Sequence, residues 1–143
     1  NNWEDSYFST SRGKERSYND EGSTNIGLRG WWRPQETGTV IPSISVGYDT
    51  SETDASSNSN TTMYFVGLNW QDIFQADDRI GLAFGQPQQR EDETTDPFAW
   101  EAYYQFQVND SVSVTPAVFG ATDRNGTADS DVTGVVVETT FKF

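Results

Sequence analysis

Apolar and polar residues alternate along this chain with a period of two, and this alternation constrains its fold more than any other feature. The last segment places one set of residues on one face of an extended strand: Val135, Val137, Thr139, Phe141 and Phe143. Glu138, Thr140 and Lys142 fall on the other face. Because successive side chains of a β-strand point to opposite faces, the segment predicts a strand with one apolar and one polar face. A final strand of this kind, ending in Phe143, is typical of an outer-membrane β-barrel.

The same period recurs along the chain, and the 3.6-residue spacing of an amphipathic helix is scarce. It predicts about eight strands, near residues 2–9, 24–34, 40–49, 62–71, 79–87, 98–108, 111–121 and 132–143. Several have the roughly 9–11 residues that a tilted strand needs to cross a bilayer. We therefore expect an all-β, antiparallel transmembrane barrel, or part of one, in a single domain over residues 1–143.

Polar connections separate the predicted strands. Those at 10–23, 50–61, 88–97 and 122–131 are long, those at 35–39, 72–78 and 109–110 are shorter, and the two kinds alternate without exception. Long external loops and short periplasmic turns are typical of outer-membrane barrels. The alternation therefore favours a barrel over a soluble sandwich.

Assigning faces strand by strand gives a lipid-facing set rich in aliphatic and aromatic residues. Its members are Ile26, Leu28, Gly30, Trp32, Val40, Pro42, Ile44, Val46, Tyr48, Tyr64, Val66, Leu68, Trp70, Ile80, Leu82, Phe84, Phe98, Trp100, Ala102, Tyr104, Phe106, Val108, Val112, Val114, Pro116 and Val118. The aromatic members gather near the two strand ends, with Trp32, Trp70, Phe106 and Phe143 at one end and Tyr48, Tyr64, Phe98 and Trp100 at the other. Such belts are expected at the two interfaces of a membrane.

Composition excludes several classes of function. The formal net charge is −13 and the pI is near 4.1, so we expect no nucleic-acid partner, because phosphates require a basic face. The chain has no His and no Cys, which removes the usual general base, the thiol nucleophile and the commonest zinc ligands. We therefore expect no enzyme activity, no cofactor and no metal site. Adjacent carboxylates such as Asp77 and Asp78 are expected to be hydrated.

Acidic residues in the long loops offer a weaker signal. Glu91, Asp92, Glu93, Asp96, Asp129 and Asp131 could gather cations or hold Ca²⁺. The spacing near Asp123 and Asp131 lacks the glycine and the closing glutamate of an EF-hand. We expect solvated loop charge at these positions.

Six stretches of the sequence resemble one family, the cyanobacterial branch of the carbohydrate-selective (OprB-like) porins, often called iron-uptake porins. They are GLRGWWRP at 27–34, SISVGYD at 43–49, VGLNWQD at 66–72, GLAFGQP at 81–87, QFQVNDSVSVTPA at 105–117 and TTFKF at 139–143. They follow one another in order from about residue 24 to the end of the chain.

The resemblance implies a passive outer-membrane channel of about sixteen strands in a Gram-negative envelope of the cyanobacterial type. Its permeants would be inorganic ions, iron or small sugars, and its partners the lipid bilayer, further copies in a homo-oligomer such as a trimer, or a remaining porin segment. The chain resembles the carboxy-terminal half of such a barrel. It opens Asn1-Asn2-Trp3 without Met, so we interpret it as a processed or partial chain.

Charged residues on the inward face are the candidate pore-lining residues: Arg29, Arg33, Arg79, Glu101, Glu138 and Lys142. A hydrated lumen tolerates such charges, and they select permeants of opposite sign. In a barrel of about eight strands, Trp31, Met63, Phe65, Tyr103 and Phe119 would plug the lumen, whereas about sixteen strands would leave a channel. From the resemblance, Phe141 and Phe143 would form the signal that the barrel-assembly machinery recognises.

Two other interpretations stay open at this point. One is a non-conducting outer-membrane structural barrel with an acidic external surface. The other is a soluble β-sandwich lectin that stacks Trp31, Trp32 or Trp100 on sugar rings.

Overall fold

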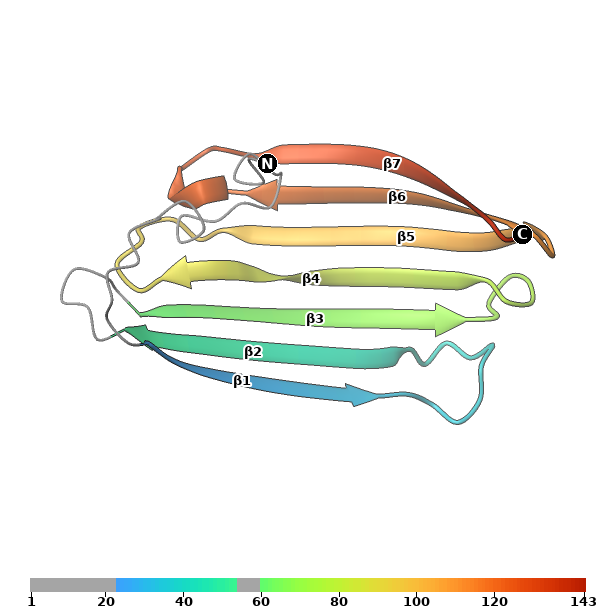
Figure 1. Ribbon diagram of the computed structural model, residues 1–143, viewed down its shortest axis with the longest axis horizontal. Helices are drawn as coiled ribbons and strands as arrows, with labels where there is room; N and C mark the ends of the chain where they lie inside the picture. The colour runs from blue at the N-terminus through green and yellow to red at the C-terminus, as the bar shows by residue number, and fades with distance from the viewer. Residues whose placement is uncertain (1–22, 54–59) are drawn as a thin grey trace.

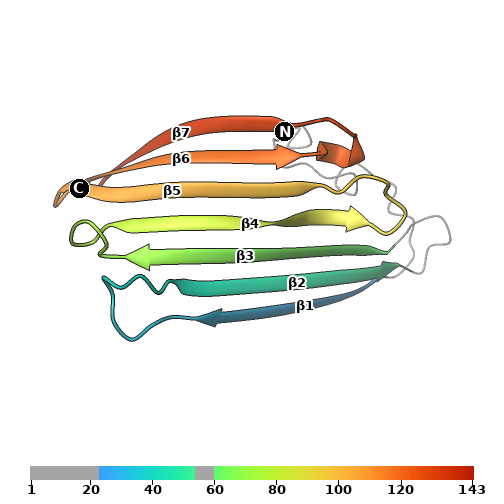
Figure 2. The same cartoon turned by 180° about the vertical axis from the view of Figure 1, so that it is seen from behind.

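The computed structural model of the chain describes residues 23–53 and 60–143, and these form one antiparallel sheet (Figures 1 and 2). Its strands are β1 (Ser23–Trp32), β2 (Ser43–Thr53), β3 (Thr61–Gln71), β4 (Arg79–Arg90), β5 (Phe98–Asn109), β6 (Val112–Thr122) and β7 (Val132–Phe141). Each strand pairs with the next one along the chain, in the order β1 to β7. The sheet is open, with β1 and β7 at its two edges. The predicted strand near 2–9 lies outside the described residues.

The all-β, antiparallel prediction is confirmed for the described part of the chain. A 3₁₀ turn, η2 (Arg124–Gly126), is its only helical element. No helix within 23–53 and 60–143 has the length and apolar character needed to span a membrane.

Two strands extend three or four residues farther than predicted. β2 continues to Thr53 instead of ending at residue 49, and β4 continues to Arg90 instead of ending at residue 87. The reason is cross-strand pairing: Ser51 pairs with Thr61, and Thr61 pairs with Arg90. Their polar side chains are typical of a loop, but their backbones pair with the neighbouring strands and extend the sheet.

Alternate connections lie at the same edge of the sheet. Residues 33–42, 72–78 and 110–111 connect strands at one edge, called here the turn edge, and residues 54–60, 91–97 and 123–131 connect them at the loop edge. The expected alternation of long and short connections is wrong, because 33–42 is longer than every connection at the loop edge. It is longer than predicted because Val40 and Pro42, assigned to a strand, lie in this connection.

The strand register places the predicted apolar residues of the strands on one face. One continuous row of cross-strand partners runs from β1 to β7 through Trp32, Ile44, Leu68, Leu82, Ala102, Val118 and Val135. Every residue in this row belongs to the apolar side predicted from alternation. We call this side the apolar face and the opposite side the polar face.

No second layer covers either face of the described sheet. Ala121, with 4% of its surface exposed, is the only buried aliphatic or aromatic residue in it. Large side chains of the apolar face remain open, including Leu28 at 64% and Val135 at 72%. A β-sandwich requires a second sheet packed on the first, so the described residues do not form one.

The strand ends are staggered in one sense across the sheet. The row that starts at Trp32, the last residue of β1, reaches β7 at Val135, whereas β7 itself continues to Phe141 at the same edge. The offset is about one residue per strand, which corresponds to an inclination of about 35° between the strands and the normal to the turn edge.

Three aromatic side chains on the polar face lie flat over glycines of neighbouring strands. Phe65 covers Gly47, Tyr103 covers Gly81 and Phe119 covers Gly134, and a Cβ atom on any of these glycines would lie within 2.3 Å of the ring. In each pair the aromatic residue and the glycine are direct cross-strand partners. The missing Cβ makes room for the ring against the backbone.

Gly81→Ala tests this packing. A Cβ at position 81 would lie 2.0 Å from Cε1 of Tyr103 and must push the ring away, so we expect a loss of about 1–3 kcal/mol in the free energy of unfolding. Urea titration in detergent measures it.

Gly30→Ala is the matched control. The nearest atom to its added Cβ is Cγ2 of Val46 at 3.4 Å, an ordinary contact. Its stability should stay equal or rise slightly, because alanine restricts the unfolded chain more than glycine does. Equal losses in both variants would show that the ring contact is unimportant.

Candidate functional site on the polar face of the sheet

The polar face carries the predicted pore-lining residues. Arg29, Arg79, Glu101 and Glu138 lie in strands, opposite polar-face partners such as Gly47, Gln105, Ala83 and Thr115. Arg33 follows the end of β1 and Lys142 follows the end of β7. The sheet therefore brings four of the six onto one face and places the other two at its turn edge.

Arg29 forms an ion pair that the sequence alone does not reveal. Its Nη1 donates to Oδ1 of Asp49 at 2.8 Å and its Nη2 donates to Oδ2 at 2.6 Å, a bidentate arrangement across β1 and β2. Nη1 also donates to the carbonyl oxygens of Leu28 and Tyr48. The charge of Arg29 is thus compensated, although half of its side chain is exposed.

Two glycines and one aromatic ring shape this ion pair. Asp49 faces Gly27 across the strands, and a Cβ at position 27 would lie 2.5 Å from Oδ1 of Asp49. The carboxylate can therefore lie across β1 and reach Arg29. On the other side, the Arg29 guanidinium carbon stands 5.5 Å from the ring centroid of Phe65, which itself covers Gly47. This distance is within the range of a cation–π contact.

Glu138 and Glu101 form no ion pair in the described part of the chain. Oε1 of Glu138 accepts a hydrogen bond from Thr140 Oγ1 at 3.4 Å, within its own strand. Glu138 lies three residues before the end of β7, and Arg29 lies three residues before the end of β1. Measured from the staggered turn edge, these two residues therefore have the same depth.

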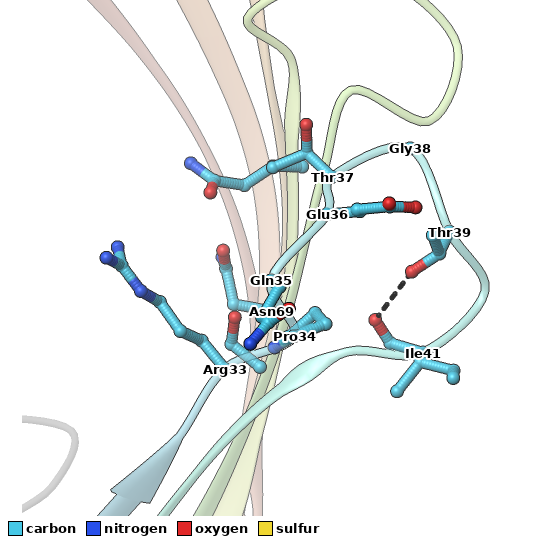
Figure 3. Close-up of a pocket in the computed structure, with 11 residues that line it drawn as sticks. Arg33, Pro34, Gln35, Glu36, Thr37, Gly38, Thr39, Ile41 and Asn69 are labelled. Carbon is cyan, nitrogen blue, oxygen red and sulfur yellow. Dashed lines mark hydrogen bonds between the residues drawn. The ribbon is translucent and has the colours of Figure 1, made fainter.

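The remaining cationic candidates lie around two neighbouring depressions at the turn edge that share Gln71. Arg33 lines the first, with the 33–42 connection, Asn69 and Ser43 (Figure 3). Arg79 and Lys142 line the second, with Gln105, Gln107, Asn109 and three carboxylates, Asp72, Asp77 and Asp110. This end of the polar face therefore carries both signs of charge and many neutral amides.

The 33–42 connection folds against the β3–β4 turn. The Gly38 amide donates to the Gln71 carbonyl at 2.8 Å, and Trp70 Nε1 donates to the Val40 carbonyl at 2.9 Å. Hydrogen bonds from Thr37 and from the Asp77 amide lower the pKa of the Asp72 carboxyl. The turn-edge depressions are therefore bounded by two connections that are bonded to each other.

Asp78 organises the β3–β4 turn, and the expectation that it would be hydrated is wrong. The residue has 0% of its surface exposed, and its carboxylate accepts hydrogen bonds from the amides of Ile73, Phe74 and Gln75 at 2.8–3.1 Å. The Tyr104 hydroxyl donates to the same carboxylate at 3.0 Å. Burial alone would raise the pKa of Asp78, but these four hydrogen bonds outweigh it and lower the pKa.

Three of the aromatic residues expected to plug a narrow lumen, Phe65, Tyr103 and Phe119, lie along the sheet. The Tyr103 hydroxyl accepts a hydrogen bond from Asn69 Nδ2 at 3.0 Å, which holds its ring down over Gly81. Trp31 remains 77% exposed on the polar face.

Acidic residues of the loop edge mostly form hydrogen bonds or ion pairs with residues of the same connection or of the strand end next to it. Glu93 accepts a hydrogen bond from the Arg90 amide, and the Arg90 guanidinium pairs with Asp92 at 2.9 Å. Asp123 accepts from the Asp129 amide at 3.0 Å, and Asp131 accepts from the Asp123 amide. Within residues 23–53 and 60–143, no three His, Cys, Asp or Glu residues are grouped so that they could hold a metal ion.

The apolar face carries aromatic residues near both ends of the strands. Near the turn edge, Tyr104 stacks on Phe106 with ring centroids 5.5 Å apart, and Phe74 meets Tyr104 edge-on at 5.9 Å. Phe74 was not among the predicted members, because it lies in a turn where alternation gives no signal. Of the predicted assembly signal, Phe141 ends β7 opposite Val112, and Phe143 is fully exposed beyond it.

Comparison of the chain with protein-family models, curated proteins and solved structures gave no match.

The low pKa of Asp78 predicts how the β3–β4 turn responds to acid. Because the folded-state pKa lies below the unfolded value of about 3.9, the carboxylate stabilises the turn fully above that value and less as pH falls through the folded pKa. Hydrogen-exchange protection of the amides of residues 73–75 should therefore decrease as the pH falls through the folded-state pKa of Asp78.

Asp78→Asn separates this effect from general acid unfolding. The variant keeps the shape of the side chain but offers one weaker acceptor, so its turn should be less protected at pH 7 and lose the acid-dependent step. The amides of β6 serve as an internal reference. A wild-type-like step in the variant would contradict the assignment.

Proposed function

We propose that this chain belongs to a passive diffusion channel of the porin class in an outer membrane, with the polar face of the sheet lining its aqueous lumen. The observation that carries the proposal is a single-layer sheet with two chemically different faces and no core. Strands of 10–12 residues match the length that tilted strands need to cross a bilayer.

Support for a membrane setting comes from the uncovered apolar face. Its aliphatic residues form a continuous surface across all seven strands, and soluble monomers rarely expose apolar patches of more than a few hundred Å². Hydrocarbon would cover this face without any further protein layer, and aromatic residues lie near both strand ends, where membrane interfaces would be.

Support for a closed barrel comes from the stagger and the open edges. An inclination of about 35° falls within the range of strand tilts found in β-barrels. Unpaired backbone groups in hydrocarbon cost several kcal/mol each, so the outer edges of β1 and β7 require partner strands. These strands would come from the remaining part of the same porin, as the resemblance to the carboxy-terminal half of a barrel of about sixteen strands implies.

One observation favours an open channel over a non-conducting structural barrel. Three of the five candidate plugging side chains, Phe65, Tyr103 and Phe119, lie over glycines of the neighbouring strands and so take up less of the space above the polar face. Small hydrated ions, iron or small sugars are the proposed permeants. The proposed setting is the outer membrane of a Gram-negative, cyanobacterial-type cell, with assembly as a homo-oligomer such as a trimer.

Planar-bilayer recording tests conduction. The complete porin that contains this chain, purified in detergent and added to one side, should produce discrete conductance steps that scale with salt concentration and show little voltage dependence. Protein that inserts into the bilayer without producing steps would favour the non-conducting structural barrel.

Arginine substitutions test the assignment of the two faces. Leu68→Arg places a charge in the proposed hydrocarbon and should cost about 2–4 kcal/mol near the membrane centre, whereas Asn69→Arg on the polar face should cost much less. The two residues are sequence neighbours, so each controls for the other. Refolding titrations in lipid vesicles measure the difference, and equal costs would contradict the proposed orientation.

A further inference from the structure

We propose that Asp49 is a specificity-determining residue of the lumen, because it cancels the charge of Arg29 and leaves Glu138 to set the ion preference at that depth. The inference rests on the proposed channel function and names the permeant class that the polar face favours, small inorganic cations. In the sequence alone, Arg29 and Glu138 would be expected to oppose each other.

The geometry of the ion pair supports local cancellation. Both guanidinium nitrogens that bond Asp49 do so at 2.8 Å or less, which is characteristic of a bidentate, charge-assisted pair. Two backbone carbonyl oxygens accept further bonds from Nη1, and the ring of Phe65 lies beside the guanidinium group. Together these contacts hold Arg29 along the sheet, so the pair presents to the lumen a dipole with no net charge.

The backbone around the pair is shaped to allow it. Gly27 and Gly47 are the β1 and β2 residues directly opposite Asp49 and Arg29, respectively. A side chain at position 27 would collide with the Asp49 carboxylate, and one at position 47 would displace Phe65. An exposed ion pair whose side chains extended away from the sheet would not require glycine at either position. The two glycines therefore indicate that this pair lies along the sheet.

With Arg29 cancelled, the uncompensated pore-lining candidates between the two edges of the polar face are the acidic residues Glu138 and Glu101. Glu138 lies at the same depth as Arg29 and has no cationic partner in the described segments. Glu101, nearer the loop edge, likewise forms no ion pair there. The other cationic candidates, Arg79, Arg33 and Lys142, lie at the turn edge, where Asp72, Asp77 and Asp110 share one of the two depressions.

The size of the effect follows from Coulomb's law. One unit charge about 10 Å from the permeation path in water changes the local concentration of each monovalent ion about two-fold, and so changes the cation-to-anion ratio about four-fold. Screening reduces this at high salt, since the Debye length falls from about 30 Å at 0.01 M to about 3 Å at 1 M. The permeability ratio should therefore be measured at low salt.

Reversal potentials of the complete porin in a KCl gradient across a planar bilayer give the test. Asp49→Asn removes the cancelling charge and should shift the cation-to-anion permeability ratio about four-fold toward Cl⁻. Arg29→Gln leaves Asp49 alone and should shift it by a similar factor toward K⁺. The exchanged double variant, Arg29→Asp with Asp49→Arg, should restore the wild-type ratio.

Two further variants test the charge of Glu138 and the geometry of the ion pair separately. Glu138→Gln, which removes an uncompensated charge at the same depth, should shift the ratio toward Cl⁻ as Asp49→Asn does. Gly27→Ala keeps both charges but displaces the carboxylate, and carbodiimide coupling to Asp49, slow in the wild type, should accelerate in it. The same acceleration is expected in Arg29→Gln.

The outcomes distinguish this inference from the proposed function. Conductance that persists in Asp49→Asn with an unchanged permeability ratio would overturn the role of Asp49 and leave the channel intact. Equal carbodiimide reactivity in the wild type and Arg29→Gln would overturn the ion pair itself. A complete wild-type porin that inserts without conducting would overturn the channel, and the specificity role with it.

Discussion

The backbone hydrogen-bond ladder is the interaction on which the rest of this structure depends, because the described sheet has no core. In most domains, two layers of secondary structure bury a shared apolar interior. Here each strand is bonded only to its neighbours, and both faces lie open. Side-chain packing is therefore lateral, between adjacent strands on the same face, and the surroundings of the apolar face decide whether the arrangement is stable.

This constraint explains why the sequence predicted the antiparallel sheet so directly. In a single sheet, the identity of each face follows from alternation alone, and the predicted apolar residues of all seven described strands occupy one face. The strand boundaries were harder to predict where polar residues such as Thr61 and Arg90 continue the hydrogen-bond ladder, since their side chains give no sign of backbone pairing. The opposite error occurred at Val40 and Pro42. They were assigned to a strand because they continue the alternation, but they lie in the 33–42 connection.

The candidate site was only partly visible in the sequence. The position of Arg29 on the polar face followed from parity, but its pairing with Asp49 required the register of β1 against β2, which alternation does not specify. Asp78 was missed for another reason: its role depends on three amides of a turn and on Tyr104 from β5. In both cases the sequence gives no sign that the carboxylate has a partner in the protein, and the backbone fold brings that partner within hydrogen-bonding distance.

The sequential strand order has a consequence for how such a chain forms and changes. Within the described sheet, every strand pairing joins segments that are adjacent in the sequence, so none of these pairings requires a distant part of the chain to fold first, and loop-closure entropy stays small at each step. Hairpins can be added one at a time, each using the exposed edge left by the previous one as its template. Evolution can lengthen or shorten such a sheet in units of two strands without disturbing the pairs already present.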